Sequence, residues 1–373
     1  MPAKFDVCIR GAGIVGQTLA LLLAQDGLRV ALVRRPPSAT PTQSPDVRAY
    51  ALNAASRSLL QSVRAWPDPT QATAVRHMRV QCTDAAQVCF DAQELDVDAL
   101  TWIVDVPALE ARLEQAISFQ PLIELAAEPQ SASLSVVSEG RASQTRTELG
   151  VAFTHKPYGQ TAIATRLRCQ NPHAQTAYQW FADGEILALL PLDGDSGNSV
   201  AVVWSVNQSR AADLMSLPQT DFAACLRAAS HGVLGDLELL GERAAWPLYA
   251  AQAQKWVGRA NWGAWALVGD AAHAVHPLAG QGLNIGLEDV AELSQVLHGK
   301  AYWREVSDMQ LLRRYERARA AALLAKGGAM DGLQQLFTRP GTLTQTIRHW
   351  GMQAFDHSGP VKRWVAQRAM GLS

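Results

Sequence analysis

The sequence predicts an α/β fold, in which a Rossmann-like domain is interrupted by a β-rich insertion and followed by C-terminal helices. The chain opens with a strand, a glycine-rich turn, a helix and a second strand over residues 5–33, which together form a β-α-β unit. Residues 161–206 contain short apolar segments with the length and composition of strands. A buried strand, "WALVG" at 265–269, follows far downstream. Because this strand can complete the opening sheet, the two domains are not consecutive along the chain.

The composition limits the class of protein. The chain has 373 residues, more than one compact core usually holds, which predicts two closely joined domains. It is 48% hydrophobic and 18% charged, and its net charge of −1 argues against a nucleic-acid partner. No apolar run reaches the length of a membrane span. The five cysteines are odd in number and never spaced C-x-x-C, which favours a reduced, cytoplasmic location.

The individual elements follow from periodicity and from the residues that start and stop them. Gly27 ends the first helix, and Pro107 suits the first turn of a later one. Residues 227–265 fit no single pattern. We predict strands at residues 5–10, 28–33, 78–83, 88–91, 161–169, 185–192, 199–206 and 265–269. We predict helices at residues 14–26, 51–63, 106–116, 282–297, 308–336 and 343–355.

These elements predict a domain organisation in which one domain is discontinuous. The α/β domain comprises residues 1–71, 106–146 and 262–335. The β-rich domain comprises residues 72–105 and 147–261, and a C-terminal helical segment comprises residues 336–373.

Gly11, Gly13 and Gly16 form the pattern G-x-G-x-x-G between the first strand and the first helix. The first glycine permits a tight turn, the second lets the backbone approach a pyrophosphate, and the third lets the helix pack on the strand. The helix N-terminus then faces the phosphate charge. A glycine-rich structural turn is the alternative, but the position of the pattern within a β-α-β unit predicts a dinucleotide site.

The residue at the end of the second strand departs from the usual pattern. An acidic residue there normally accepts hydrogen bonds from ribose hydroxyls, whereas this chain has Arg34. Arginine has only donors, so we expect Arg34 to leave these hydroxyls to water or to turn outward. An arginine near this position also suits the 2′-phosphate of NADP, which keeps NADP open as an alternative cofactor.

A second motif, "LVGDAAHAVHPLAGQGLNIGLEDV", includes the end of the downstream strand. Asp270 directly follows this strand, where its carboxylate can accept hydrogen bonds from hydroxyl groups, and Ala271 leaves room for a ligand. Gly280 and Gly282 expose backbone N–H groups at the start of a helix, whose positive end then points at the ligand. A flavin needs such an acceptor for its ribityl chain and such donors near its ring. NADP has no ribityl chain, so this motif favours FAD.

These motifs resemble those of the flavoprotein aromatic-ring hydroxylases, and "GDAAHAVHPLAGQGLNIGLEDVAEL" is similar to the branch that acts in ubiquinone biosynthesis. "DVRAYALN", "YGQTAIATRL" and "LLRRYERARAA" agree, so the resemblance covers nearly the whole chain. It implies a p-hydroxybenzoate-hydroxylase-like fold and an FAD-dependent monooxygenase that hydroxylates a polyprenylated phenol. It also implies NAD(P)H as electron donor and molecular oxygen as cosubstrate.

The resemblance further implies which residues form the site. Pro277 and the backbone at Gly280 and Gly282 are the predicted catalytic elements, and no side chain is required as a general base. Arg48 resembles the arginine that these hydroxylases place near the cofactor, although a solvated surface arginine is the alternative. The predicted cofactor-binding residues are Gly11, Gly13, Gly16, Arg34, Arg48, Asp270, Ala271, Gly280, Gln281, Gly282, Leu283 and Asn284.

His273 and His276 raise the alternative of a metal site. Two histidines at this spacing supply too few ligands alone, and no acid or cysteine lies at a recognisable spacing from them. Because the flavin motif already accounts for this stretch, we predict no metal.

The chain also departs from the family pattern at three places. In the third motif of the family, an Asp-Gly pair followed by a serine and an arginine, Glu139 replaces the aspartate while Ser143 and Arg146 are retained. Val106 replaces a polar residue that would face the cofactor, and the short segment 118–134 leaves no room for a hairpin that the family has. Most of these changes lie on the adenosine side, so we expect weak FAD binding. A non-catalytic scaffold subunit of the same fold is therefore an alternative.

The β-rich domain is expected to form the floor of the substrate pocket. Residues on its strands that could line the pocket, with plain core as the alternative, are Trp180, Phe181, Leu187, Leu189 and Trp204. A small soluble phenol is the alternative to a polyprenylated substrate.

Residues 339–373 carry five basic side chains and one acid, with Trp350 and Trp364 interleaved. This pattern favours a peripheral contact with the inner membrane, from which a prenylated substrate would come. Other proteins of ubiquinone biosynthesis are expected as further partners. An ordinary basic surface helix is the alternative.

Overall fold

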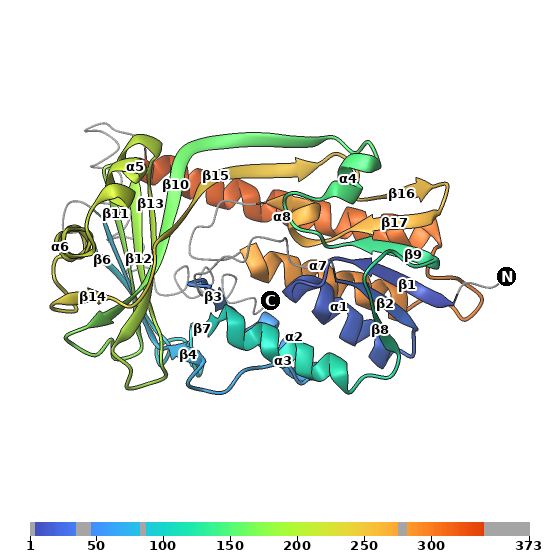
Figure 1. Ribbon diagram of the computed structural model, residues 1–373, viewed down its shortest axis with the longest axis horizontal. Coiled ribbons are helices and arrows are strands. Elements are labelled where there is room, and N and C mark those ends of the chain that lie inside the picture. Colours follow the sequence, from blue (N-terminus) through green and yellow to red (C-terminus); the bar gives the residue numbers. More distant parts are fainter. Residues whose placement is uncertain (1–3, 35–45, 83–86, 275–281, 339–373) are drawn as a thin grey trace.

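The computed structural model describes residues 4–34, 46–82, 87–274 and 282–338, which form two lobes (Figure 1). One lobe is built on a six-stranded sheet and the other on a nine-stranded sheet. Strands β10 (Phe153–Cys169) and β15 (Ala244–Ala253) pair with each other and run from one lobe to the other (Figure 1). The chain therefore joins the lobes through continuous paired strands as well as through loops.

The six-stranded sheet has the order β16-β17-β9-β1-β2-β8. Its strands are β1 (Phe5–Arg10), β2 (Val30–Val33), β8 (Ile123–Ala126), β9 (Ala132–Val137), β16 (Val257–Ala260) and β17 (Gly263–Leu267). β9 pairs in parallel with both β1 and β17. The downstream strand thus completes the opening sheet, and the predicted α/β fold with a β-rich insertion is confirmed. The exact domain limits stay a proposal, since β16 already belongs to this sheet before residue 262.

Helices pack around this sheet. α1 (Ile14–Gln25) contacts α3 (Val106–Ser118) and α7 (Gly282–His298), and α7 contacts the long α8 (Met309–Thr338). All four residues of β2 are buried, as expected for a parallel strand between helical layers. The segment between α3 and β9, which the structure describes in full, holds β8 as its one strand, so it contains no hairpin.

A three-stranded sheet with the order β3-β7-β4 adjoins the α/β lobe. Its strands are β3 (Ala49–Leu52), β4 (Ala72–Val75) and β7 (Thr101–Asp105). The helix predicted over residues 51–63 was wrong at its start, because β3 pairs with β7 and α2 (Ala54–Ser62) begins only after Asn53. The partner strand lies about fifty residues away in the sequence, where a local pattern cannot show it.

We expect Asn53→Ala to destabilise the protein by about 1 kcal/mol. Asn53 is the N-cap of α2, and its side-chain oxygen accepts a hydrogen bond from Ser56 N at 2.9 Å. Alanine lacks this acceptor and leaves a buried N–H group unpaired. Urea unfolding measures the difference, with Asn53→Asp as a control that keeps the capping oxygen. An equal loss of stability in both variants would contradict the capping role.

The nine-stranded sheet forms the β-rich lobe, in the order β18-β15-β10-β13-β12-β11-β5-β6, with β14 paired to β10. Besides β10 and β15, its strands are β5 (His77–Cys82), β6 (Gln87–Asp91), β11 (Thr176–Ala182), β12 (Glu185–Pro191), β13 (Ser199–Asn207), β14 (Leu237–Leu239) and β18 (His273–Ala274). Helices α5 (Gln208–Ser216) and α6 (Gln219–Ala229) pack on one of its faces.

The face of the nine-stranded sheet under α5 and α6 carries most of the side chains that the sequence suggested as pocket lining. Trp180, Leu187, Leu189 and Trp204 belong to a single buried cluster with residues of these two helices. These four side chains are therefore part of the hydrophobic core, which was the alternative to pocket lining. The suggestion that they line the substrate pocket is wrong. Phe181 follows Trp180 on β11, so its side chain points to the opposite face.

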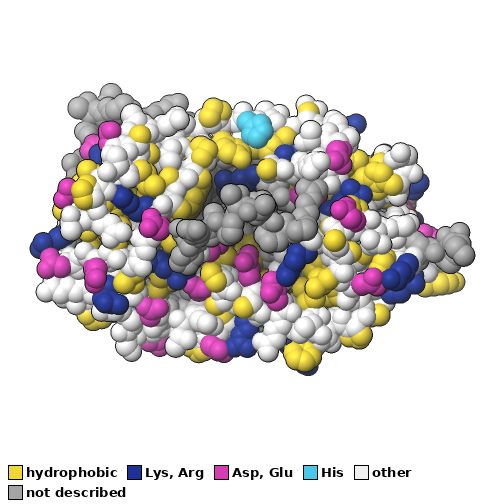
Figure 2. Space-filling model, in the orientation of Figure 1, with side chains coloured by type: hydrophobic (Ala, Val, Ile, Leu, Met, Phe, Trp, Pro, Cys, Tyr) yellow, Lys and Arg dark blue, Asp and Glu magenta, His cyan; other side chains and the backbone are white. Residues whose placement is uncertain are grey.

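That opposite face is lined by smaller side chains. Ala188, Leu190 and Ala201 form a buried cluster with Ala51 and Ile103 of the three-stranded sheet. On the outside of the molecule, acidic and basic side chains are interspersed over the face shown in Figure 2, in keeping with a net charge of −1.

Candidate functional site

The glycine-rich turn between β1 and α1 lies at the carboxyl end of the parallel strands, where α/β folds bind ligands. Gly11 has φ +114°, and a Cβ added there would lie 2.5 Å from the carbonyl oxygen of Ser138, just after β9. A Cβ on Gly16 would lie 2.0 Å from the carbonyl oxygen of Gly11. The Ser138 hydroxyl donates to that same Gly11 oxygen at 2.8 Å. Packing within the protein therefore requires both of these glycines.

Gly13 has a different environment. A Cβ added there would meet no atom of the described residues within 4 Å. Gly13 is the N-cap of α1, where no side chain caps the helix and no acidic residue lies in the first turn. The first backbone N–H groups of α1 are thus available to an anion. Open space in front of an uncapped helix N-terminus fits the pyrophosphate of a dinucleotide.

Asp270 lies in the 3-10 turn η1 (Gly269–Ala271), close behind β17. Its side chain is 41% exposed, and Oδ2 accepts a hydrogen bond from Arg141 Nε at 3.0 Å. Arg146 holds the turn from the interior, because its Nη1 donates to the Ala271 carbonyl oxygen at 3.0 Å. The Asp270 carboxylate, which is predicted to accept hydrogen bonds from the ribityl chain, is therefore accessible, and the Arg141 guanidinium lies beside it.

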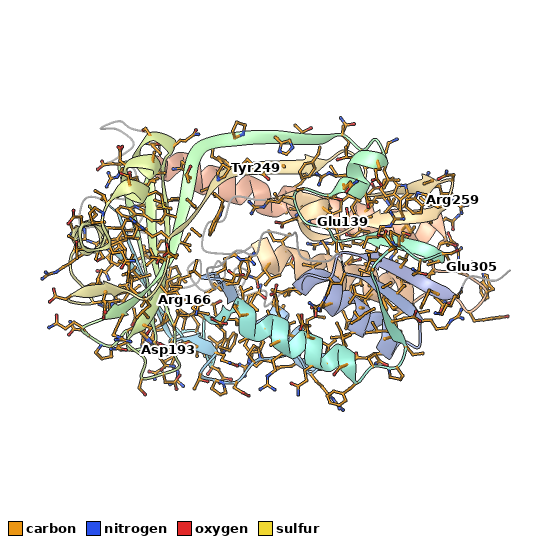
Figure 3. The ribbon with its side chains drawn as sticks, viewed as in Figure 1. Glu139, Arg166, Asp193, Tyr249, Arg259 and Glu305 are labelled. Carbon is orange, nitrogen blue, oxygen red and sulfur yellow. The ribbon has the colours of Figure 1, made fainter. Side chains whose placement is uncertain are left out.

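Glu139, which stands where the resemblance predicts aspartate, points back toward its own segment (Figure 3). Its Oε2 accepts hydrogen bonds from Ser143 Oγ at 2.8 Å and from Thr145 N at 2.9 Å. Its Oε1 accepts from Thr145 Oγ1 at 2.9 Å. The longer side chain thus fixes the start of α4 (Gln144–Glu148), the helix from which Arg146 reaches the Asp270 turn.

Arg48 lies just before β3, where the two lobes meet. Its guanidinium pairs with Asp46 at 2.5 Å, and this hydrogen-bonded contact raises the pKa of Arg48. Its backbone oxygen accepts from Val106 N at 3.4 Å and from Arg166 Nη2 at 3.3 Å. Arg166 comes from β10 and also pairs with Asp105 at 2.5 Å (Figure 3). The segment that carries Arg48 is therefore bound to both lobes.

Tyr50 is a candidate site residue that sequence reasoning missed. It lies on β3 near both Arg48 and Asp270. Burial raises the pKa of its hydroxyl, and the negative charge of Asp270 adds to the rise, while Arg48 opposes it. The phenol therefore stays neutral and able to donate a hydrogen bond beside the predicted ribityl acceptor. Its position in "DVRAYALN" could have indicated Tyr50, but Arg48 is the residue of this segment that the resemblance places near the cofactor.

Arg34 turns toward α3. Its Nη2 pairs with Glu114 Oε1 at 2.6 Å, and both side chains are about half exposed. Glu110, one turn earlier on α3, is half-buried, and burial raises the pKa of its carboxyl. Acidic groups thus lie beside the end of β2 even though the strand itself ends in an arginine.

The start of α7 carries several of the other predicted residues. A Cβ on Gly282 would meet no atom within 4 Å in the described ranges. Leu283 is buried behind it. Four candidate residues lie outside the described residues: His276, Pro277, Gly280 and Gln281.

The side chain of Asn284 makes three hydrogen bonds within the protein. Its Oδ1 accepts from Asn53 N at 3.0 Å and from Ser56 Oγ at 2.8 Å. Its Nδ2 donates to the Ala51 carbonyl oxygen at 2.7 Å. Asn284 therefore ties α7 to β3 and α2, and its predicted cofactor contact stays a prediction.

His273 is bound to a buried carboxylate. Its Nε2 lies 2.6 Å from Asp289 Oδ2, and its ring stacks on Trp256 with centroids 5.0 Å apart. Within the residues that the structure describes, no three His, Cys, Asp or Glu side chains gather as a metal site requires.

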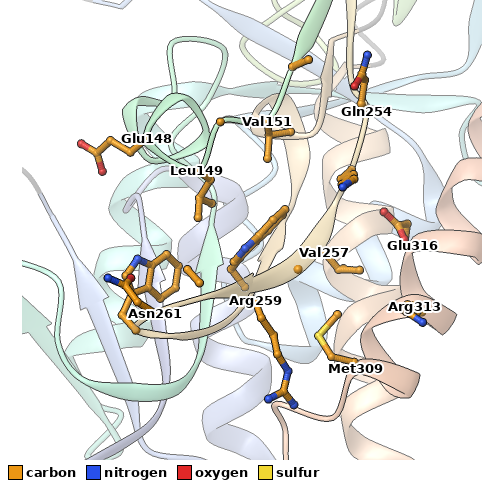
Figure 4. A pocket seen from close by; sticks show the side chains of 17 residues that line it. Glu148, Leu149, Val151, Gln254, Val257, Arg259, Asn261, Met309, Arg313 and Glu316 are labelled. Atoms are coloured by element: carbon orange, nitrogen blue, oxygen red, sulfur yellow. The ribbon is translucent and has the colours of Figure 1, made fainter.

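A cavity of about 850 Å³ lies apart from these residues (Figure 4). It is bounded by β16, β17 and the start of α8, and Arg259, Trp262 and Arg313 are among its lining residues. None of the described cofactor candidates lines it. This cavity is therefore not the predicted dinucleotide site.

Comparison with known proteins shows the family of the chain. The family described as "FAD binding domain" matches residues 4–118 and 126–325. The chain belongs to this family. It is 30% identical over 394 residues to 3-demethoxyubiquinol 3-hydroxylase of Escherichia coli, with 98% of each chain covered. It is 29% identical over 391 residues to ubiquinone hydroxylase UbiL of Rhodospirillum rubrum, covering 98% of this chain and 89% of that protein.

Solved structures show the same fold. p-Nitrophenol 4-monooxygenase PnpA from Pseudomonas putida superimposes with a TM-score of 0.75 at 16% identity, covering 99% of both chains. PqsL from Pseudomonas aeruginosa superimposes with a TM-score of 0.70 at 18% identity, covering 94% of this chain and 99% of that chain. The predicted family, the p-hydroxybenzoate-hydroxylase-like fold and the enzyme class are confirmed, and this FAD-binding-domain protein is an FAD-dependent monooxygenase. The lack of described atoms within 4 Å of a Cβ at Gly13 and the accessible carboxylate of Asp270 fit FAD.

Proposed function

We propose that this monooxygenase hydroxylates the ring of a polyprenylated phenol in ubiquinone biosynthesis, with NAD(P)H as electron donor and molecular oxygen as cosubstrate. The observation that carries the proposal is the similarity to 3-demethoxyubiquinol 3-hydroxylase, which covers 98% of both chains and not the FAD motifs alone. The β-rich lobe, where a substrate would bind, is included in this similarity. A second relative of similar extent carries the name ubiquinone hydroxylase.

In this proposal each part of the site has one task. The N-terminus of α1 at Gly13 holds the pyrophosphate of FAD, and Asp270 accepts hydrogen bonds from the ribityl hydroxyls. The start of α7 at Gly282 would face the flavin ring, and Pro277 and Gly280, which the resemblance assigns to the same place, lie outside the described residues. When bound, FAD supplies the redox chemistry that activates oxygen, which no side chain of the protein provides.

The protein contributes position and charge. α7 directs its positive end toward the site, while Ala188, Leu190 and Ala201 pack against Ala51 and Ile103 and belong to the core between the sheets. The sequence contains one dinucleotide motif, so NAD(P)H would have to reach the flavin without a Rossmann domain of its own. No side chain is needed as a general base.

The proposal is tested by purifying the protein gently and measuring its flavin content and its NAD(P)H oxidation. We expect bound FAD and an oxidation rate that rises when a short-chain prenylated phenol is added, with formation of the hydroxylated ring. Stimulation by simple phenols alone would favour a hydroxylase of small soluble phenols. A folded protein that neither retains nor takes up FAD would favour the scaffold alternative, which the Arg34–Glu114 pair at the adenosine end motivates.

We further propose that residues 339–373 contact an anionic membrane surface, on the cytoplasmic side of the inner membrane, and that other proteins of ubiquinone biosynthesis act beside the enzyme there. The segment lies outside the described residues. Among the described helices, none is long and apolar enough to cross a membrane. The basic residues and tryptophans of the segment are the feature that supports a surface contact.

Replacing Lys362 and Arg363 by glutamine is expected to weaken binding to anionic vesicles about tenfold or more, since each basic side chain near such a surface contributes about 1 kcal/mol. Cosedimentation with phosphatidylserine-containing vesicles at low salt measures this. The matched control replaces Lys255 and Arg259, which carry the same charge and are exposed on the α/β lobe. Equal losses in both pairs would contradict a specific role for the C-terminal segment.

A further inference from the structure

The carboxylate of Asp289 is buried in the third turn of α7, with no exposed side-chain surface. Its Oδ2 accepts hydrogen bonds from Gly269 N at 2.8 Å and from His273 Nε2 at 2.6 Å. Its Oδ1 accepts from Arg319 Nε at 2.7 Å. A buried charge is costly unless it is fully paired, and a well-packed apolar residue would often be at least as stable. A buried carboxylate at position 289 is therefore better explained by a role other than stabilising the fold.

The two residues that share Asp289 Oδ2 flank the Asp270 turn. Gly269 immediately precedes Asp270, and His273 follows the turn on β18. The Asp270 side chain itself takes no part in this anchor; it pairs with Arg141 and remains 41% exposed. One buried oxygen atom thus holds both ends of the turn while leaving the Asp270 carboxylate accessible.

The same carboxylate is tied to the first turn of α7. Arg319 of α8, which binds Asp289 Oδ1, also donates through Nη2 to the carbonyl oxygen of Ile285 at 3.3 Å and to Glu288 Oε2 at 3.1 Å. Burial raises the pKa of Asp289, but the positive groups of His273 and Arg319 lower it by more, which keeps the carboxylate charged. The Asp270 turn and the start of α7 are therefore connected through a single anion.

We propose that Asp289 is a positioning residue for the flavin: by clamping Gly269, His273 and Arg319 it fixes the Asp270 carboxylate relative to the N-terminus of α7. The inference rests on the proposed role of Asp270 as the ribityl acceptor. A site whose donors and acceptors come from two elements needs such support to keep both at the productive distance. Asp289 touches no cofactor atom in this scheme and acts only through the turn and the helix.

The test compares Asp289→Asn with Tyr315→Phe. The asparagine keeps the volume but removes the charge and one acceptor, so we expect a folded protein whose dissociation constant for FAD rises about tenfold. Tyr315→Phe removes a buried hydrogen bond of the neighbouring helix α8, from the Tyr315 hydroxyl to the Leu267 carbonyl oxygen at 2.9 Å. It should lower the melting temperature without changing the FAD dissociation constant, since it leaves the clamp intact. Quenching of flavin fluorescence on titration into apoprotein gives both constants.

A double-mutant cycle with Asp270→Ala separates positioning from general destabilisation. If Asp289 acts through Asp270, Asp289→Asn should change FAD affinity less than about twofold in the Asp270→Ala background. A full tenfold effect in that background, or unchanged FAD affinity in Asp289→Asn alone, would overturn the proposal.

If Asp289→Asn does not fold, His273→Phe keeps an aromatic ring against Trp256 and removes the His273–Asp289 contact while leaving Gly269 and Arg319 bound to the carboxylate. It should weaken FAD binding severalfold, and wild-type affinity in this variant would equally overturn the inference. Absence of FAD binding by the wild type is a different result, because it would contradict the proposed site itself.

Discussion

Gly13→Val is expected to weaken FAD binding at least about a hundredfold, or about 2.7 kcal/mol, while the apoprotein remains folded. Gly13 is an extended N-cap at φ −77° and ψ −179°, a conformation that valine adopts readily. A Cβ there meets no described atom within 4 Å, so the protein itself has room for the side chain. The pyrophosphate does not, because it must approach this backbone closely. Titration of apoprotein with FAD and thermal unfolding without FAD measure the two effects.

Gly16→Ala is the matched control and should show the opposite pattern. Its Cβ would lie 2.0 Å from the Gly11 carbonyl oxygen, so the apoprotein must distort, at a cost of about 1–3 kcal/mol. The loss of stability should therefore appear even without cofactor. If Gly13→Val bound FAD like the wild type, the pyrophosphate would not lie at this turn. If it lowered the melting temperature as much as Gly16→Ala, the space before Gly13 would be needed by the protein.

Asp270→Ala is expected to weaken FAD binding by about tenfold to a hundredfold, which corresponds to the 1.5–3 kcal/mol of a hydrogen bond to a charged group. The apoprotein should lose little stability, since the Asp270–Arg141 pair is partly exposed and such pairs contribute at most about 1 kcal/mol. The variant should therefore be folded but colourless after purification.

The control for Asp270→Ala is Asp6→Ala. Asp6 pairs with Arg29 at 3.0 Å, the same distance as the Asp270–Arg141 contact, and lies on β1 far from the carboxyl ends of the strands. This variant should bind FAD like the wild type. Wild-type affinity in Asp270→Ala would show that the ribityl chain has another acceptor, and Tyr50, whose hydroxyl oxygen can accept a hydrogen bond, would be the next residue to examine.

Sequence reasoning predicted the fold correctly where it depends on contiguous residues. The glycine-rich turn between β1 and α1 could be recognised because it brings Gly11 and Gly16 against neighbouring backbone, so only glycine fits. The strand before Asp270 could be recognised from its apolar run, and it joins the opening sheet as expected.

Sequence reasoning could not predict contacts between side chains that lie far apart in the sequence. Arg34 and Glu114 are 80 positions apart, and nothing in the sequence near Arg34 indicates that its guanidinium turns to α3. Asn284 stands in the flavin motif, and nothing near it in the sequence indicates that its side chain binds β3 and the start of α2. Such pairings depend on how helices pack, which local patterns do not encode.

The aromatic residues of the β-rich lobe show a second limit. Alternation along a strand separates two faces but does not say which of them meets helices and which meets the site. α5 and α6 have short, weakly apolar sequences and were not predicted, so the face of Trp180 and Trp204 could not be recognised as the covered one.

The position of β17 has a consequence for synthesis of the chain on the ribosome. In the finished sheet β9 lies between β1 and β17, but β9 ends at Val137 and β17 begins at Gly263, a separation of 126 positions (137 to 263). At about 5–20 residues per second, translation takes roughly 6–25 s to cover that interval. Throughout it, the outer edge of β9 exposes unpaired N–H and C=O groups that can template pairing with another chain. The nascent protein is therefore expected to be a chaperone client until residue 267 has emerged, and premature chain termination before that point should yield aggregates in place of a smaller folded flavoprotein.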